Sequence, residues 1–436
     1  MTKTRSFPAI VLCLVSASTA IAQDRAAAPV KAAPAQDAPL QGATEKSAPV
    51  QGAPATGAPV QGSPEKTAPG KSAPTVPATV SSDMARDSIA KAAAWLVKTQ
   101  NANGSWGHGV LESVQMLWCA NETHYAFQMA ANGLVIKALL AIDETPERRA
   151  ALEKGLEWLC TTRVPKRGSD WDIDCSWSGL YGFNGIVAAA LDPRFQAEPW
   201  KSKLAKRGLE LYQLLEKNQE PMGGWGYYEG PIVSHRPTWS TSFSTACVIP
   251  SLIDAKEKLG WAIDPEVTAR AVRYVGRCRL PNGAVSYDLD SVPRMEGEMI
   301  NATKGSLGRI QVANWALRRA HVASVTDERL RQGLELFFEH HKFLDAARLM
   351  PVPHESWYQN AAYFYFFGHY HAALAINELP AAEREALHAR LRPHLLKAQW
   401  KDGSSVDFLN TSWMRIAGTC FSLLALEAGL DAPRGI

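Results

Sequence analysis

The stretch KAAAWLVKTQNANGSWG, residues 91–107, joins an amphipathic segment to a glycine turn. Trp95 and Leu96 lie on the apolar face that a helix of this sequence would have, and Gly104 is placed to end that helix. Gln100, Gly104 and Trp106 have the spacing Gln-x-x-x-Gly-x-Trp, which returns at residues 219, 223 and 225. The sequence therefore contains a helix-plus-turn module more than once.

A second pattern recurs at a period of roughly sixty residues. It consists of a basic residue, a small residue and an aromatic residue, and it occurs as Lys91-Ala92-Trp95, Lys154-Gly155-Trp158, Arg207-Gly208-Tyr212 and Arg270-Ala271-Tyr274. Weaker copies run from Arg331 to Phe337 and from Leu391 to Gln399, where Ser405 stands in place of the tryptophan. Together these copies indicate six repeat units.

Each unit continues into a second segment that is apolar on nearly all sides, such as SWSGLYGFNGIVAAAL at residues 176–191. A helix of that kind belongs in an interior, with its amphipathic partner covering it. Six such hairpins cannot each bury their own apolar face, and closing them into a ring removes the exposed ends. We therefore expect an all-α, (α/α)6 toroid of six helical hairpins, with the second helices lining its centre.

These modules resemble the repeats of the squalene cyclase and protein prenyltransferase superfamily, the terpenoid cyclase-like α-toroids. The resemblance covers roughly residues 84–431, with two full motif copies and four degraded ones. It implies the toroid fold for residues 83–436. It says less about function, because one fold hosts many chemistries.

The N-terminus has the features of a secretory signal. Lys3 and Arg5 precede an apolar run from Ala9 to Val15, and small residues end the segment at Ala22. We interpret residues 1–22 as a signal peptide, too short in its apolar run for a transmembrane helix. The mature protein is then expected to be exported, to the periplasm or the extracellular space.

Residues 23–82 are rich in Ala, Pro, Gln and Gly and almost free of large apolar side chains. Such a composition cannot bury enough surface to offset the entropy lost on ordering, so we expect a disordered linker. The formal charge of +3 comes from interspersed charges without a basic stripe, which argues against nucleic acid as a partner. An apolar small molecule or lipid, or a protein of the cell envelope, remains open as partner.

The segment DWDIDC, residues 170–175, resembles the Asp-x-Asp-Asp motif with which squalene cyclases protonate an alkene. On that alignment Asp172 is the first position, Asp174 is the proton donor and Cys175 replaces the last aspartate. An alternative interpretation makes Asp174 the N-cap of the helix that follows, since Asp is a preferred residue there. The two roles predict different effects of an Asp174→Asn substitution.

Aromatic residues stand at the entrances of several of the expected central helices. Aromatic walls can stabilise carbocations, stack on sugars or pack against each other. We take as candidate ligand-binding residues Trp177, Trp239, Trp357, Tyr358, Trp413, Tyr125, Tyr181, Phe243 and Tyr363, with Tyr365 nearby.

The resemblance to protein prenyltransferases raises the question of a catalytic zinc. Their His-Thr-Cys stretch corresponds here to Gly418-Thr419-Cys420, which lacks the histidine ligand. His369 and His371 are two residues apart and so lie on different faces of a helix. We therefore expect neither a metal nor another cofactor. Cys247 and Cys420 are interpreted as small buried apolar residues, and a pairing of Cys119 with Cys160 or Cys175 is left open.

Three functions fit these observations. The first is a squalene-cyclase-like toroid that binds an apolar ligand, terpenoids included, with acid-initiated cyclisation through Asp174. The second is a binding or scaffold domain without catalysis at the cell envelope. The third is a carbohydrate-active (α/α)6 enzyme, for which Glu122 with His124, His354 with Glu355, Asp172 with Asp174, and Arg236 could supply the acid and base.

Overall fold

The computed structural model describes residues 81–112, 120–166, 175–227, 237–289, 299–409 and 411–430. The chain divides into two units between residues 76 and 77, and every described residue belongs to the second unit. The signal peptide predicted for residues 1–22 lies outside the described residues. So does the predicted linker, except for Ser81 and Ser82, which begin the first helix. No helix among the described residues is both long and apolar enough to cross a membrane.

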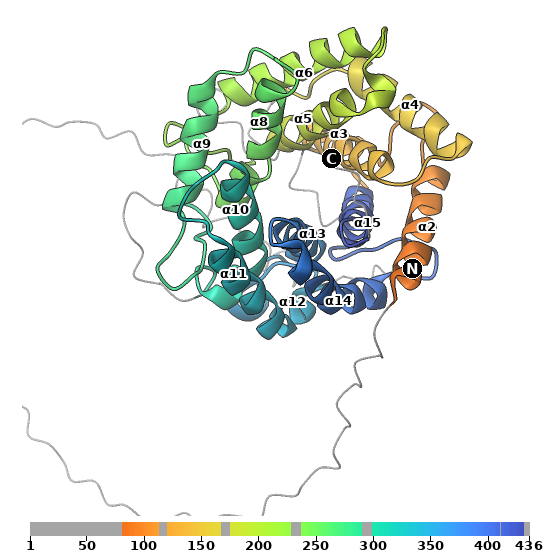
Figure 1. Ribbon diagram of the computed structural model, residues 1–436. Helices are drawn as coiled ribbons and strands as arrows, with labels where there is room; N and C mark the ends of the chain where they lie inside the picture. The colour runs from red at the N-terminus through yellow and green to blue at the C-terminus, as the bar shows by residue number, and fades with distance from the viewer. Residues whose placement is uncertain are drawn as a thin grey trace, which may run out of the picture. The chain divides into compact units, whose positions relative to one another are not determined.

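Six helices form the outer layer of a ring, and a second set lines its inside (Figure 1). The outer helices are α2 (Ser82–Lys98), α4 (Pro146–Thr161), α6 (Trp200–Lys217), α9 (Pro265–Arg277), α11 (Asp327–Glu339) and α14 (Ala381–Ala398). The inner ones are α3 (Asn121–Ala141), α5 (Ser176–Leu191), α7 (Ser242–Ala246) with α8 (Ile249–Glu257), α10 (Leu307–Arg319), α13 (Phe364–Asn377) and α15 (Ser412–Glu427). Short elements connect them: η2 (Pro193–Phe195), η3 (Thr303–Gly305), α12 (Lys342–Ala347) and η4 (Trp357–Gln359).

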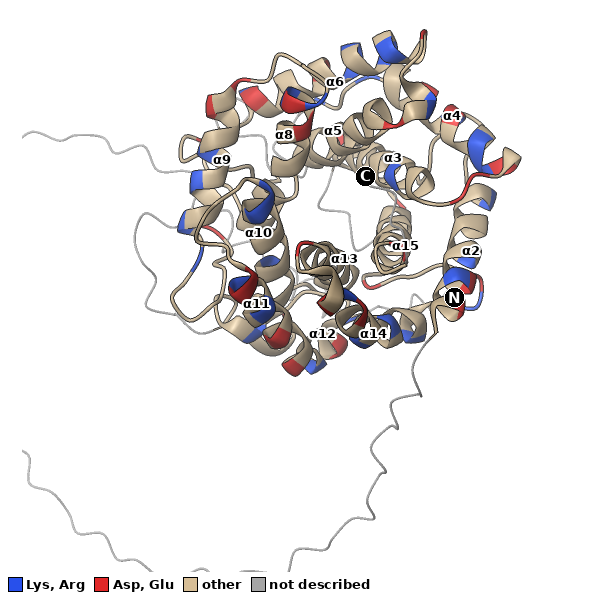
Figure 2. Ribbon diagram, viewed as in Figure 1, with Lys and Arg blue, Asp and Glu red and all other residues tan. Residues whose placement is uncertain are grey.

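The two layers differ in burial as the sequence pattern predicts. Helix α3 is buried almost all round from Thr123 to Ala141, whereas α9 buries only the stripe that contains Val267, Ala271 and Tyr274. Charged residues accordingly lie mostly on the outer helices (Figure 2). The (α/α)6 toroid expected from the repeats is confirmed.

The ring is closed by contacts between its first and last hairpins. Helix α15 packs against both α2 and α3, and α14 contacts α2. Helices from the two ends of the toroid therefore lie side by side, as the orange and blue helices of Figure 1 show. No hairpin is left with an uncovered apolar face, which is what a stack of such units needs for stability.

The Gln-x-x-x-Gly-x-Trp module links one hairpin to the next. The side-chain amide of Gln100 donates hydrogen bonds to the Gly104 carbonyl (2.9 Å) and to the Ala151 carbonyl of α4 (2.8 Å). The indole of Trp106 donates to the Leu96 carbonyl at the end of α2 (2.7 Å). One glutamine thus holds its own turn and the neighbouring outer helix at the same time.

The same arrangement occurs at two other junctions. Gln219 donates to the Gly223 and Val267 carbonyls, both at 2.8 Å. Gln399 donates to the Gly403 carbonyl (3.0 Å) and to the Ser88 carbonyl (2.9 Å), and Ser88 lies in α2. The degraded sixth copy of the motif therefore makes the bond that joins the last unit to the first.

Glycine is required at the turn for two reasons. Gly104 has φ = +90°, a conformation that L side chains rarely adopt. A Cβ atom there would lie 2.5 Å from the Lys154 carbonyl oxygen. The next residue of α4, Gly155, lies against the ring of Trp106, where a Cβ would approach to 2.6 Å. The basic-small-aromatic pattern therefore marks the surface on which the preceding turn packs.

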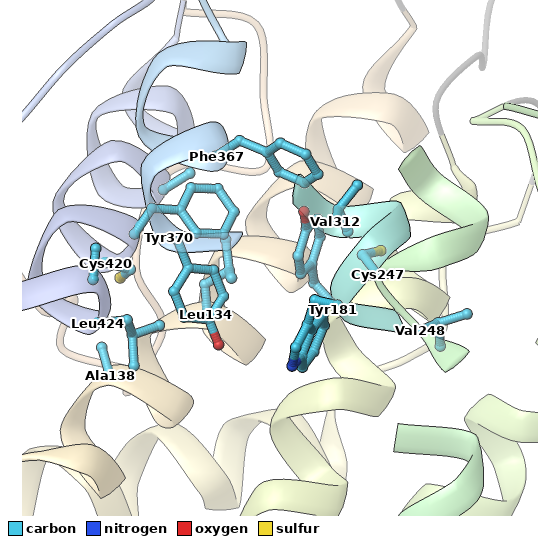
Figure 3. Packing of buried hydrophobic residues seen from close by; sticks show 14 of the residues in the cluster. Leu134, Ala138, Tyr181, Cys247, Val248, Val312, Phe367, Tyr370, Cys420 and Leu424 are labelled. Atoms are coloured by element: carbon cyan, nitrogen blue, oxygen red, sulfur yellow. The ribbon is translucent and has the colours of Figure 1, made fainter. Parts of the chain in front are cut away.

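The inner helices meet in an apolar core (Figure 3). Cys247 and Cys420 are 4% and 0% exposed and belong to this core, which confirms their interpretation as small buried residues. Cys160 carries a free thiol. Cys119 itself lies outside the described residues.

Candidate active site

A cavity of about 250 Å³ is enclosed chiefly by residues of the inner helices and of the loops that lead into them. Its wall is mainly aromatic. The lining residues are Phe127, Trp177, Tyr181, Tyr227, Phe243, Pro353, His354, Tyr363, Phe364, Phe367, Asp407, Phe408, Trp413, Met414, Ala417, Gly418 and Phe421. Ligand pockets typically measure about 300–1,000 Å³, so this volume suits a compact ligand.

The aromatic rings of the wall hold one another in place. Trp177 stacks on Tyr181 and on Tyr227, with ring centroids 5.6 Å apart in both pairs. On the facing side, Phe127 stacks on Trp413 at 4.6 Å. Rings packed in this way have few rotamers available, which makes the cavity pre-formed. Their faces present a negative quadrupole that favours apolar and cationic groups.

Asp407 is the acidic residue of this wall. It is 2% exposed, and its Oδ2 atom accepts a hydrogen bond from the backbone N–H of Phe366 (3.1 Å). Burial raises the pKa of Asp407 to about 7, although the backbone hydrogen bond and the nearby Arg348 favour the charged form. A carboxyl group with that pKa keeps its proton in a large fraction of molecules at neutral pH.

Sequence reasoning missed Asp407, although the repeat contains a signal for it. The residue four positions after the turn glycine is His108, Tyr227, Tyr287 and Asp407 in the four modules that have such a glycine. Tyr227 and Asp407 line the cavity, and Tyr287 contacts Tyr227 through its hydroxyl group. This position of the module therefore points toward the cavity in several units.

A chain of hydrogen bonds runs along the cavity from His354. Its Nδ1 atom lies 2.8 Å from the Gln359 carbonyl, which can only accept, so Nδ1 carries the proton. Its Nε2 atom then accepts a hydrogen bond from the Tyr363 hydroxyl group (2.9 Å). The Tyr363 oxygen lies 3.4 Å from the Tyr287 oxygen, which in turn contacts that of Tyr227. Burial lowers the pKa of His354, which favours the neutral ring.

Five of the predicted ligand-binding residues line this cavity: Trp177, Tyr181, Phe243, Tyr363 and Trp413. Trp239 lies behind the wall, edge-on to Tyr227 at 4.8 Å, and its indole donates to Asp288 (2.9 Å). The register of the inner helices is the basis for predicting that these aromatic residues lie near one mouth of the ring. The role of these residues in ligand binding remains a prediction.

The other predicted aromatic residues lie away from the cavity wall. Tyr125 packs on Trp158 and beneath the guanidinium group of Arg163. Trp357 is 71% exposed, and Tyr358 has φ = 56° in the short helix η4. The tight η4 turn directs Trp357 outward and packs Tyr358 edge-on against Phe343, which a pattern of aromatic residues before a helix does not reveal. Tyr365 faces the outer layer, and its hydroxyl donates to the His394 carbonyl (3.3 Å).

Asp172 and Asp174 lie outside the described residues, as does Arg236. Helix α5 begins at Ser176, and Cys175 occupies its N-cap position without a side-chain capping bond. The proton-donor role predicted for Asp174 is therefore still a prediction.

The carboxylates proposed for carbohydrate chemistry are placed differently. Glu122 is bound by Arg163 (2.7 Å) and by the backbone N–H of Lys166 (2.9 Å). His354 borders the cavity, but its sequence neighbour Glu355 is exposed. Among the described lining residues, Asp407 is the only one with a carboxyl side chain. Glycoside hydrolysis ordinarily needs a pair, so its second carboxyl group would have to come from outside the described part of the chain.

Two solved structures that resemble this chain are helical toroids. The GH76A α-1,6-mannanase of a Salegentibacter species has a TM-score of 0.50 and 13% identity, over 80% of this chain and 98% of the mannanase. The apo form of the type II terpene cyclase MstE from Scytonema has a TM-score of 0.48 and 12% identity, with the same coverage. No family model and no curated protein sequence matches the chain. The likeness to the mannanase structure shows the toroid fold alone, so the activity has to be argued from the residues.

Proposed function

We propose that this toroid binds a compact apolar ligand of the isoprenoid class in its aromatic cavity, and that acid-initiated cyclisation is its activity. The observation that carries the proposal is the combination in one wall of closely packed aromatic rings with the buried carboxyl group of Asp407, whose pKa is raised to about 7. Apolar surface favours an apolar ligand, and a neutral acid can approach a double bond without the cost of burying a charge.

The reaction conserves atoms and needs no redox partner. A proton leaves the Asp407 carboxyl group and forms a C–H bond with one carbon of an alkene. The other carbon becomes cationic and is attacked by a second double bond of the same molecule, which closes a ring. Loss of a proton from a neighbouring carbon restores an alkene, so the product is an isomer of the substrate.

The aromatic faces have a defined part in this scheme. A carboxyl group with a pKa near 7 is a weaker acid than an ordinary one, so proton transfer to carbon has a substantial barrier. Trp177, Tyr227 and Phe243 are grouped on one side of the wall and stabilise the developing cation by cation–π attraction. Phe127 and Trp413 do so from another side. Asp174 stays a second candidate acid.

Export to the periplasm or extracellular space belongs to the same proposal, since residues 1–22 have a signal-peptide pattern. An exported toroid would take its ligand from the cell envelope, where isoprenoid lipids are present in the membrane. The Ala- and Pro-rich residues 23–82 would then act as a tether of the disordered, partly polyproline type.

The experiment has two parts. Small molecules are first extracted from the full chain purified from its native envelope and identified by mass spectrometry. The protein is then incubated with farnesol and geranylgeraniol, and isomers of unchanged mass are separated by gas chromatography. We compare the wild type with Asp407→Asn, Asp174→Asn and, as a control on a surface turn, Asp402→Asn.

The proposal expects an isoprenoid bound to the wild type and conversion that Asp407→Asn abolishes without lowering the melting temperature. Asp402→Asn should retain conversion. Conversion lost only in Asp174→Asn would move the acid to that residue. A bound apolar ligand without conversion in any variant would reduce the function to binding, and an empty protein or a bound glycan would overturn the proposal.

A further inference from the structure

Three histidines come together on the outer side of α13, away from the residues that line the cavity. His341 lies at the junction between α11 and α12, His369 lies in α13, and His394 lies in α14. Each offers one ring nitrogen to a group whose members all lie within 4.8 Å of one another. His341 and His369 are buried and His394 is partly buried. Three separate helical segments thus contribute one donor each.

The hydrogen bonds of two of these rings fix their tautomers. The Nδ1 atom of His369 lies 2.7 Å from the Tyr365 carbonyl, which can only accept, so this nitrogen carries a hydrogen. The Nδ1 atom of His341 lies 3.0 Å from the carboxylate of Asp345, which also accepts. In the neutral rings both Nε2 atoms therefore carry lone pairs and no hydrogen.

These two Nε2 atoms face each other at 2.9 Å. Two acceptors repel at that separation unless a cation lies between them. The cation can be a proton shared by the two rings or a metal ion bound by both. A zinc ion held by nitrogen atoms at about 2.0–2.1 Å in tetrahedral geometry would need them only slightly farther apart.

The third histidine favours the metal. A shared proton needs two nitrogen atoms, whereas the ring of His394 lies against that of His341, with centroids 3.6 Å apart and the planes tilted by 33°, and adds a third donor.

Another histidine of the same helix shows that the cluster is unusual. His371 makes the same Nδ1 hydrogen bond to the carbonyl four residues before it, that of Phe367 (2.8 Å). Its ring packs on Phe367 and Trp315, and among the described residues no second histidine ring contacts it. A buried histidine bonded to its own helix is thus ordinary, and the convergence of three is not.

We propose that His341, His369 and His394 bind one Zn²⁺ ion, with Asp345 as a positioning residue that orients His341. Three imidazole nitrogens suit zinc, and a carboxylate on the far nitrogen of a ligand histidine fixes its tautomer and orientation. The ion leaves a fourth position for water. It joins the α11–α12 junction, α13 and α14, and so stabilises the fifth and sixth hairpins against each other.

The test uses the untagged full chain after treatment with a chelator and removal of the chelator. Zinc is added back, the bound metal is measured by mass spectrometry, and thermal unfolding is followed with and without zinc. Cobalt is used as a second probe, because Co²⁺ bound to nitrogen ligands in a tetrahedral site absorbs in the visible range. The variants are His394→Gln, which removes the least buried ligand, and His371→Gln, which is the matched control.

We expect one zinc per chain, a higher melting temperature with zinc and a visible cobalt band. His394→Gln should lose the bound zinc, the rise in melting temperature and the cobalt band. His371→Gln should still bind one zinc per chain and show the cobalt band. Asp345→Asn keeps every ligand, so it should retain the stoichiometry with about 10- to 100-fold weaker binding. That variant also serves if His394→Gln does not fold. A wild type that binds no zinc and shows no change in melting, or binding that His394→Gln leaves intact, would overturn the proposal.

Discussion

The carboxyl group of Asp407 accepts a hydrogen bond from the backbone N–H of Phe366 in the first turn of α13, and it lies in the wall of the aromatic cavity. Backbone N–H donors and the nearby Arg348 do not replace the water that burial removes. The neutral form is therefore favoured over the carboxylate, and the pKa rises to about 7 from an ordinary value of 3.8. This shift links the chemistry of the cavity to the stability of the fold.

The shift predicts how stability depends on pH. Because the folded protein holds the Asp407 proton more tightly than the unfolded chain, this residue's contribution is full below pH 4 and is lost as pH rises to about 7. At 1.36 kcal/mol per pH unit, the loss is a few kcal/mol, about 4 at most. Asp407→Asn cannot ionise. We expect it to be more stable than the wild type at pH 8 and to have no such advantage at pH 4, as measured by denaturant unfolding.

Asp402 supplies a control of opposite sign. Burial is the largest single effect on its pKa and raises it, but hydrogen bonds from Ser404 and the charge of Arg415 together bring the pKa below its ordinary value. Its contribution is therefore complete above the ordinary pKa and falls only in acid. Asp402→Asn should lower stability by the same amount at pH 6 and pH 8. If the change in unfolding free energy caused by Asp407→Asn is also the same at every pH, the prediction that Asp407 is buried with a raised pKa is wrong.

Ligand binding can be followed by tryptophan fluorescence. Trp177 and Trp413 line the cavity, whereas Trp357 is 71% exposed and lies outside it. Adding geranylgeraniol to the full chain should change the emission, because an apolar molecule replaces water at two indole rings. Trp177→Phe and Trp413→Phe should each reduce the change, and Trp357→Phe should leave it unaltered. An equal loss in Trp357→Phe would place the ligand on the outer surface.

The fold could be predicted from the sequence because its rule is local and repeated. Gln100, Gly104 and Trp106 lie within seven residues, and they make their contacts to their own turn and to the next outer helix. The same spacing returns at Gln219 and, in degraded form, at Gln399. Together with the basic-small-aromatic repeat, these copies indicate the number of units. A pattern that recurs in this way survives the loss of one element, such as the replacement of tryptophan by Ser405.

The site could be predicted only in part, because its chemistry depends on contacts between units. The position of Asp407 follows from the module only after the register of His108, Tyr227 and Tyr287 is known. The histidine cluster combines residues from three elements, and the count along one helix that separates His369 from His371 says nothing of His341 or His394. Trp357 shows the opposite error, since the turn of η4 carries it outward.

The packing of the turn on the next helix predicts an unusual glycine effect. Gly155→Ala adds a Cβ that would lie 2.6 Å from the Trp106 ring, which is itself fully buried and cannot move. We expect a loss of about 1–3 kcal/mol in unfolding free energy, despite the better helix propensity of alanine. Chemical denaturation of the two proteins measures this directly.

Gly276 provides the matched comparison. It lies in the last turn of α9, and a Cβ there meets no atom within 4 Å. Gly276→Ala should therefore be neutral or stabilising by about 0.4–1 kcal/mol, because it restricts the unfolded chain. Similar losses at both glycines would show that backbone entropy, and not contact with Trp106, decides the outcome at Gly155.

The side chain of Gln399 links the sixth unit to the first, as do the hydrogen bonds from Ser412 to the Glu112 carboxylate. It donates to the Ser88 carbonyl (2.9 Å) and accepts from the Ser88 hydroxyl group (2.9 Å). Gln399→Ala leaves these groups unpaired, so we expect a loss of about 1–3 kcal/mol. We also expect faster hydrogen exchange in α2, measured by mass spectrometry.

Two further variants separate closure from general weakening. Gln219→Ala removes the equivalent bond at an internal junction and should cost a similar free energy, but it should accelerate exchange in α9 and leave α2 protected. Gln332→Ala removes an exposed bond to Glu328 and should change stability by less than about 0.5 kcal/mol. Helices α14 and α15 pack on α2 where the ring closes. If hydrogen exchange in α2 is the same in Gln399→Ala as in the wild type, this helix packing closes the ring without the Gln399 bond.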